Sequence, residues 1–213
     1  KKLMDVDFGN PSSRHQKGVV AEGYIKEARQ KIAATLKVDP KELIITSGGT
    51  ESNNMALIGT ALAAKRKGNH IITTAVEHPS VKATASFLEE QGFRITFLSV
   101  DSRGQISLED LKEALTPDTI LVSIMYVNNE IGTIQPVEEA AKLVHATVPG
   151  AVFHVDAIQA YGKVMIRPKQ QGIDLLSVSS HKFHGPKGAG FLYCSSKVNL
   201  HPIIFGGGQQ SGM

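Results

Sequence analysis

Apolar residues recur along this chain in two spacings. Short apolar runs rich in β-branched residues are typical of buried strands, whereas apolar positions three and four residues apart are typical of helices that pack on a sheet. The first pattern predicts strands at residues 42–46, 70–73, 94–100, 119–125, 151–155, 173–178, 189–193 and 199–205. The second pattern predicts helices at residues 19–36, 51–65, 80–91, 107–115 and 137–147.

The predicted strands and helices alternate along most of the chain. This alternation indicates an α/β fold of three layers, with a mostly parallel sheet and helices on both faces. The connection from Lys182 to the strand at 189–193 contains no predicted helix, so we expect that strand to run antiparallel to its neighbours. A chain of 213 residues is long enough for one substantial core, and we expect residues 1–213 to form a single large domain.

Composition narrows the classes of partner and compartment. The formal charge of +3 is spread along the chain rather than gathered in blocks, which gives no reason to expect binding to nucleic acid or to a membrane. No apolar run approaches the roughly 20 residues that span a bilayer. The single cysteine, Cys194, excludes an internal disulfide and fits a reducing compartment, so we expect a soluble cytoplasmic protein.

A lysine follows the apolar strand at 173–178. Ser179, His181 and Lys182 come at the strand end, where Gly185 and the residues after it stop regular structure. Ligand crevices of open α/β sheets form at strand ends, so Lys182 is a candidate Schiff-base nucleophile for an aldehyde. A solvated loop lysine is the alternative interpretation.

Other candidate residues also follow predicted strands. Gly49 and Thr50 stand between a strand and a helix, in a pattern that suits a phosphate cradle or, alternatively, a plain helix cap by Thr50 or Ser47. An acid directly after a strand, Asp156, needs a partner such as a protonated ring nitrogen, or else caps a helix. The remaining strand-end candidates are His78, Asn129 and Gln159.

Together these residue types match the parts of a pyridoxal 5'-phosphate site. The set contains phosphate donors, a ring that can stack, an acid for a pyridinium nitrogen, amides for a phenolic oxygen and a lysine for an aldehyde. A nicotinamide-dependent dehydrogenase is disfavoured, because the Gly-x-Gly-x-x-Gly fingerprint after the first strand is missing. The pair His181 and His184 lacks a third ligand, so we expect no metal site.

The chain also closely resembles the cysteine desulfurases, which are class V of the aminotransferase-like, fold type I pyridoxal phosphate enzymes. The Gly-Pro-Lys-Gly segment is more similar to the subgroup that serves iron–sulfur assembly and nitrogen fixation. The matching segments, in family order, are Phe8-Gly9-Asn10-Pro11-Ser12-Ser13, Thr46-Ser47-Gly48-Gly49-Thr50-Glu51-Ser52-Asn53-Asn54, Glu77-His78, Val127-Asn128-Asn129-Glu130-Ile131-Gly132, His154-Val155-Asp156-Ala157 with Gln159, and Ser180-His181-Lys182 with Gly185-Pro186-Lys187-Gly188.

The resemblance implies a role for each matching position. Lys182 would bind the cofactor aldehyde and move the α-proton of the substrate, and His78 would stack on the ring and act in acid–base steps. Asp156 would keep the pyridine nitrogen protonated. The remaining positions would bind the phosphate (Gly49, Thr50, Ser179 and His181), the phenolate oxygen (Gln159), and the ring or the substrate carboxylate (Asn129).

The activity implied is removal of sulfur from L-cysteine, giving L-alanine and an enzyme persulfide for iron–sulfur cluster or other sulfur-transfer pathways. The resemblance also implies a homodimer and a sulfur-acceptor or scaffold protein as partners. The chain begins at Lys1 and ends at Met213, so we expect an N-terminal segment and a C-terminal small domain to be missing from it.

One departure from the family concerns the nucleophile. The sulfur-accepting cysteine of the family is expected after Met213, and Cys194 on its predicted strand is interpreted as a small buried hydrophobic residue. Two alternatives to a cysteine desulfurase stay open. These are a selenocysteine lyase and a non-catalytic, truncated domain that binds the cofactor or partner proteins.

Overall fold

The computed structural model describes residues 5–206, so the chain ends considered above, Lys1 and Met213, lie outside the described residues. Within this range one sheet has the strand order β1-β7-β6-β5-β4-β2-β3. The strands are β1 (Leu43–Thr46), β2 (His70–Thr74), β3 (Arg94–Leu98), β4 (Thr119–Met125), β5 (Val152–Asp156), β6 (Leu175–Ser179) and β7 (Gly190–Cys194). The helices of the described chain pack on the two faces of this sheet.

The sheet is mostly parallel. Neighbouring strands from β3 to β6 pair in parallel, and β7 pairs antiparallel with both β1 and β6. The antiparallel direction predicted for residues 189–193 is therefore confirmed. Since β1 also opposes β7, six strands point the same way, and their carboxyl ends meet at one edge of the sheet.

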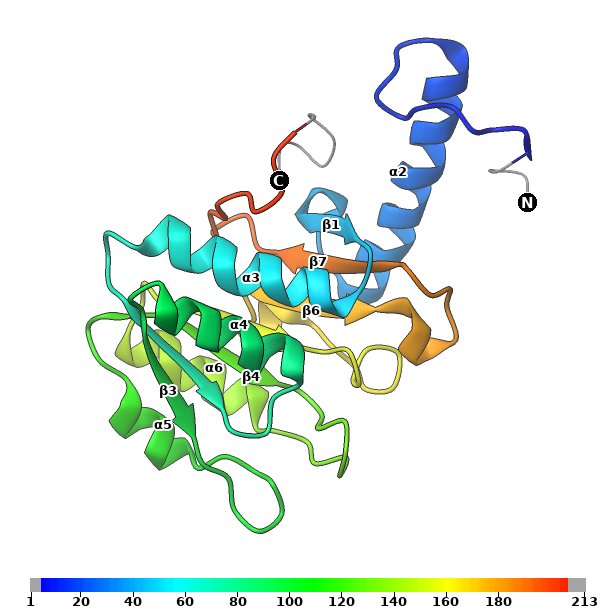
Figure 1. Cartoon of the computed structure of the whole chain (residues 1–213). Coiled ribbons are helices and arrows are strands. Elements are labelled where there is room, and N and C mark those ends of the chain that lie inside the picture. The colour runs from blue at the N-terminus through cyan, green and yellow to red at the C-terminus, as the bar shows by residue number, and fades with distance from the viewer. Residues whose placement is uncertain (1–4, 207–213) are drawn as a thin grey trace.

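Helices cover both faces of the sheet. Figure 1 shows α3 and α4 crossing one face, with α5 and α6 on the other side. This arrangement confirms the predicted three-layer α/β fold. The helical elements are α2 (Gln16–Leu36), η1 (Pro40–Glu42), α3 (Gly49–Ala64), α4 (Pro79–Glu90), α5 (Leu108–Ala114), α6 (Val137–Thr147), α7 (Pro168–Gln171) and η2 (Ser180–Phe183).

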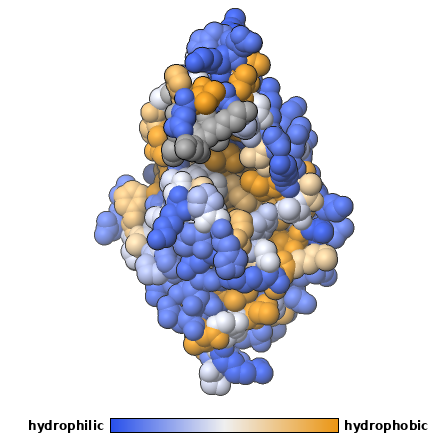
Figure 2. Space-filling view, turned by 90° about the vertical axis from the view of Figure 1, so that its right-hand side faces the viewer, coloured by the Kyte–Doolittle hydropathy of each residue, from blue (hydrophilic) through white to orange (hydrophobic). Residues whose placement is uncertain are grey.

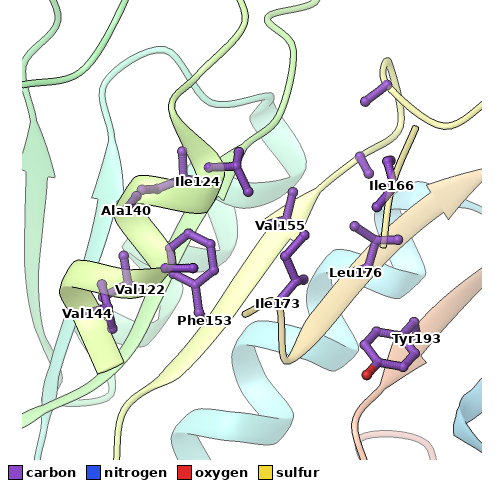
Figure 3. Packing of buried hydrophobic residues seen from close by; sticks show 14 of the residues in the cluster. Val122, Ile124, Ala140, Val144, Phe153, Val155, Ile166, Ile173, Leu176 and Tyr193 are labelled. Atoms are coloured by element: carbon purple, nitrogen blue, oxygen red, sulfur yellow. The ribbon is translucent and has the colours of Figure 1, made fainter. Parts of the chain in front are cut away.

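The two helical layers explain why the strands are apolar throughout. Alternate side chains of a strand point to opposite faces, and both faces are covered here. Leu175 of β6 accordingly joins the cluster under α3 and α4, whereas Leu176 joins the cluster under α5 and α6. Figure 3 shows the latter cluster, where Phe153 of β5 lies near Val122 of β4 and Val144 of α6.

The five predicted helices correspond to α2 through α6, but one strand prediction is wrong. Residues 199–205 form no strand. Leu200 packs instead near Gly59 of α3, and the His201 N–H donates to the Gly59 carbonyl at 3.0 Å. The apolar residues of this segment are thus partly buried by a helix, and Pro202 has no N–H for a strand ladder.

The surface is mixed in character. Figure 2 shows hydrophilic residues over much of one side of the molecule, with hydrophobic residues gathered in smaller areas. Exposed large hydrophobic side chains include Phe8, Val19, Ile131 and Met165. Among the described residues, no helix combines the length and the apolar character needed to cross a membrane.

Candidate active site

A pocket of about 180 Å³ opens at the carboxyl ends of the parallel strands. The register places Met125 of β4, Asp156 of β5 and Ser177 of β6 at neighbouring strand ends. All nine predicted site residues line the pocket. Its lining is Gly49, Thr50, His78, Ser80, Met125, Asn129, Asp156, Ile158, Gln159, Ser179, His181 and Lys182.

The start of α3 forms one wall of the pocket. Gly48 precedes this helix with φ 153° and ψ −169°, a backbone conformation available essentially to glycine alone, and no side chain caps the first turn. The alternative in which Thr50 or Ser47 caps the helix is therefore wrong. The Ser47 hydroxyl donates to Glu51 instead, at 2.5 Å. Because the first N–H groups of a helix lack intrahelical acceptors, this end can bind an anion.

Close packing around these glycines shapes the wall. A Cβ on Gly49 would lie 2.1 Å from Cδ1 of Ile158, and a Cβ on Gly48 would lie 3.4 Å from Oγ of Ser179. Oγ of Ser179 is in turn 2.9 Å from Nδ1 of His181. An adjoining opening shares Gly49, Ser179 and His181 with the pocket, so the open helix end and these side chains face a common space.

Asp156 is the last residue of β5 and is only 4% exposed. Its carboxylate accepts hydrogen bonds from Nδ2 of Asn53 at 2.9 Å and from the N–H of Ile158 at 3.0 Å. Burial raises the pKa of Asp156, and these hydrogen bonds oppose that rise. The interpretation of Asp156 as a helix cap is wrong, because a turn rather than a helix follows it.

Lys182 lies on the rim of the pocket, in the short helix η2, where its side chain is exposed. The helix ends at His184, whose φ of 67° places it in the left-handed region. Gln159 and Asn129 also line the pocket; Gln159 accepts from Lys163 at 3.3 Å, and Asn129 donates to Glu130 at 2.6 Å. The lysine amine and the two amide groups thus border one cavity.

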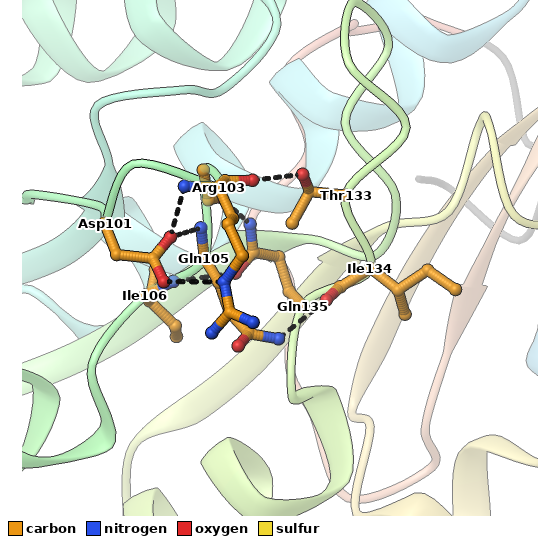
Figure 4. Close-up of polar contacts among 8 residues, drawn as sticks. Asp101, Arg103, Gln105, Ile106, Thr133, Ile134 and Gln135 are labelled. Carbon is orange, nitrogen blue, oxygen red and sulfur yellow. Dashed lines mark hydrogen bonds and ion pairs between the residues drawn. The ribbon is translucent and has the colours of Figure 1, made fainter.

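The loop that carries Asn129 is fixed by polar contacts with a neighbouring loop. Gln135 donates to the carbonyl of Gly104 at 2.7 Å and accepts from the N–H of Ile106 at 3.0 Å. Figure 4 shows this connection, together with Asp101, whose carboxylate accepts from backbone N–H groups of its own loop. Because Gln135 is buried, these bonds stabilise the segment that leads away from β4.

Two buried residues beside the pocket had no role in the sequence-based prediction. Glu77 accepts at Oε1 from Thr74 at 2.9 Å and from the N–H of Met125 at 2.8 Å. Burial, followed by repulsion from Asp156, raises the pKa of Glu77 to about 8. Asn53, fully buried on α3, contacts Asp156. The sequence could have pointed to both residues, because each lies in one of the segments that resemble the family named in the sequence analysis.

Cys194 lies at the end of β7, away from the pocket lining. Its side chain is half-buried, and burial raises the pKa of the thiol to about 12. A thiol with so high a pKa is a poor nucleophile at neutral pH.

Comparison with known proteins identifies relatives over almost the whole chain. The relatives include a putative cysteine desulfurase IscS 1 of Bacillus subtilis, 53% identical over 95% of this chain and 53% of the relative. A cysteine desulfurase IscS of Dictyoglomus turgidum is 49% identical over 99% of this chain and 53% of the relative. The chain therefore spans about half the length of the curated relatives it matches.

Solved structures give the same result for the fold. A NifS-like protein superposes with a TM-score of 0.96 at 42% identity, over 99% of this chain and 58% of that one. A structure described as SspA in complex with cysteine has a TM-score of 0.95 at 41% identity, over 100% of this chain and 61% of that one. The family profile for aminotransferase class-V matches residues 3–212. On this evidence, the chain belongs to the aminotransferase class-V family.

Proposed function

We propose that this chain forms the pyridoxal phosphate-binding large domain of a cysteine desulfurase. Such an enzyme removes sulfur from L-cysteine and gives L-alanine and an enzyme persulfide for iron–sulfur cluster assembly or another sulfur-transfer pathway. The observation that carries the proposal is one pocket that combines an uncapped helix end, a buried carboxylate and a lysine. The relatives named as cysteine desulfurases and the neighbour described as a cysteine complex support it.

The residues of the pocket fit this cofactor. The open start of α3 at Gly49 offers N–H donors to a phosphate group, and Ser179 and His181 add side-chain donors beside it. The buried carboxylate of Asp156 suits a protonated ring nitrogen, which would stabilise its charge. Lys182 supplies a primary amine for the aldehyde.

Each residue then has a task in the reaction. When bound, pyridoxal phosphate supplies an electron sink for negative charge on the substrate α-carbon. Asp156 would hold a proton at the ring nitrogen, and Gln159 would donate a hydrogen bond to the phenolic oxygen. The Lys182 amine would hold the aldehyde and, once the amine of the substrate replaces it there, would be free to move the α-proton. The two remaining side chains would orient the ligand: His78 against the ring, and Asn129 at the ring or the substrate carboxylate.

We propose that Cys194 does not accept the sulfur, because it lies outside the pocket lining and burial raises the pKa of its thiol to about 12. We assign this role to a cysteine outside this chain. In the overall reaction, one thiol and one L-cysteine give one persulfide and one L-alanine. We further propose a cytoplasmic homodimer that delivers sulfur to an acceptor or scaffold protein, as the resemblance to the cysteine desulfurases implies.

The test begins with the purified protein and pyridoxal phosphate. Binding should produce a visible absorption band, and borohydride reduction followed by peptide mapping should find the cofactor on Lys182. The Lys187→Ala variant is the matched control, because this neighbouring lysine is also exposed in the same glycine-rich segment. An adduct on Lys187, or no adduct on a folded protein, would exclude the assigned site.

The activity is tested on the full-length protein. With L-cysteine and a reducing thiol, the loaded enzyme should form alanine and sulfide in equal amounts. Replacing L-cysteine by L-selenocysteine compares the two substrates. Failure to form alanine from L-cysteine, with the cofactor on Lys182, would refute a cysteine desulfurase while leaving the cofactor site intact.

A further inference from the structure

A chain of hydrogen bonds leads from Asp156 to His78 along the wall of the pocket. Nδ2 of Asn53 lies 2.9 Å from Oδ2 of Asp156 and 2.9 Å from Oγ of Ser80. Oγ of Ser80 lies 2.8 Å from Nδ1 of His78, and the N–H of Ser80 donates to the same nitrogen at 3.1 Å. Asn53 is 0% exposed and Ser80 is 8% exposed, which limits competition from water for these bonds.

Chemistry fixes the direction of each bond in this chain. The Asn53 side-chain nitrogen has two hydrogens and no lone pair to offer, so it donates to both Asp156 and Ser80. The Ser80 hydroxyl, which accepts from Asn53, keeps its own hydrogen to donate to His78. Nδ1 of His78 therefore receives two donors, the hydroxyl and the N–H of Ser80. A nitrogen that accepts hydrogen bonds carries no proton, so the neutral ring bears its proton on Nε2.

The position of His78 in the fold adds to this preference. His78 is the N-cap residue of α4, and its side chain accepts a hydrogen bond from the N–H of Ser80 in the first turn of the helix. A proton on Nδ1 would point at this N–H. The cap therefore favours the same tautomer as the hydrogen-bond chain.

We propose that Asn53 and Ser80 are positioning residues that hold His78 as the neutral tautomer with its proton on Nε2. Its catalytic meaning rests on the proposed function. In that reaction, His78 presents a hydrogen-bond donor to the ligand, and Nδ1 is not available as a proton acceptor. The same chain links the orientation of His78 to Asp156, the acid assigned to the ring nitrogen.

The test is nitrogen NMR of the imidazole rings in the ¹⁵N-labelled protein, with and without pyridoxal phosphate. Two-bond proton–nitrogen correlations distinguish Nδ1 from Nε2 and show which one carries the proton. A His78→Gln spectrum assigns the signals. When the His78 ring is neutral, we expect an unprotonated Nδ1 and a protonated Nε2. A wild-type ring protonated on Nδ1, or an equal mixture, would overturn the inference without any variant.

Variants then test the two positioning residues. Loss of one hydrogen bond in Ser80→Ala or Asn53→Leu should raise the population protonated on Nδ1 roughly three- to tenfold. Ser80→Thr retains a hydroxyl and should restore the wild-type ratio, and Ser86→Ala, on the exposed side of α4, should leave it unchanged. If the ratio of the two His78 tautomers is unchanged in both Ser80→Ala and Asn53→Leu, Asn53 and Ser80 do not position His78.

The NMR result for His78 can be distinguished from the test of the proposed function. If pyridoxal phosphate does not bind but the Nε2 tautomer is observed, the positioning role stands and the cofactor assignment fails. If the cofactor binds to Lys182 and His78 is protonated on Nδ1, the cofactor assignment stands and the positioning role fails.

Discussion

The buried carboxyl group of Glu77 should make the stability of this protein fall as the pH rises. Glu77 is 3% exposed, and it lies close enough to Asp156 for repulsion to act between the two acids. Its Oε1 accepts two hydrogen bonds, whereas its Oε2 has no partner among the described residues. Glu77→Gln keeps the accepting oxygen and removes the ionisable proton. The variant therefore resembles the protonated acid at every pH.

The magnitude follows from the two pKa values. Burial raises the pKa of Glu77 from 4.5 to about 8. Between these values the folded state keeps a proton that the unfolded state has released, so the free energy of unfolding decreases with rising pH. Each pH unit changes it by about 1.4 kcal/mol, and the whole window amounts to about 5 kcal/mol. The variant lacks this loss and should gain about 3–4 kcal/mol on the wild type between about pH 5 and about pH 8.

The assay is urea unfolding of wild type and variant from about pH 5 to about pH 8, monitored by circular dichroism. Two buried histidines act in the opposite direction at acidic pH, since burial lowers the pKa of His70 to about 4 and that of His154 to about 3. Their folded state stays neutral while the unfolded histidines bind protons below about pH 6.5. Because both proteins contain these histidines, their contribution cancels in the difference. Glu90→Gln, exposed on α4, is the matched control.

If the difference in unfolding free energy between Glu77→Gln and the wild type is the same at both ends of the pH range, Glu77 is not held protonated by the fold. A constant offset from the new amide does not affect this test, because only the change with pH is used.

Two further predictions concern the pocket walls. A Cβ on Gly190 would lie 2.6 Å from the carbonyl oxygen of Val178 and 2.7 Å from Cα of Gly48. Gly190→Ala should therefore destabilise the protein by about 1–3 kcal/mol in melting experiments and weaken pyridoxal phosphate binding in titrations. Gly150→Ala is the control, because a Cβ there meets open space and should change neither quantity. The two carboxylate oxygens of Asp156 accept separately from Asn53 and from the N–H of Ile158, so Asp156→Asn places an amide N–H opposite one of these donors. The variant should destabilise the cofactor-free protein by about 1–3 kcal/mol and bind pyridoxal phosphate at least tenfold more weakly; an equally stable or equally tight-binding variant would contradict this assignment.

The sequence alone predicts seven of the strands, the five longer helices and the place of the pocket. Apolar periodicity is a local property, and it identifies the strands that the helices cover on both faces. The candidate residues follow those strands directly in sequence, so parallel strands with a common direction gather them at one edge. For this reason the sequence predicts site residues such as Lys182, Asp156 and Thr50, and all three line the pocket. Their roles in binding and catalysis stay predictions.

Only the tertiary structure decides which polar groups meet and how far each is buried. Asn53 and Asp156 are 103 positions apart, and no local pattern indicates their hydrogen bond. The pKa of Glu77 likewise depends on its burial and on Asp156, neither of which is encoded in its neighbours along the chain. The failed strand at 199–205 has the same cause, because an apolar segment can be buried by a helix as well as by a sheet. Solvation and long-range contacts are properties of the folded chain, and they determine the chemistry of this site.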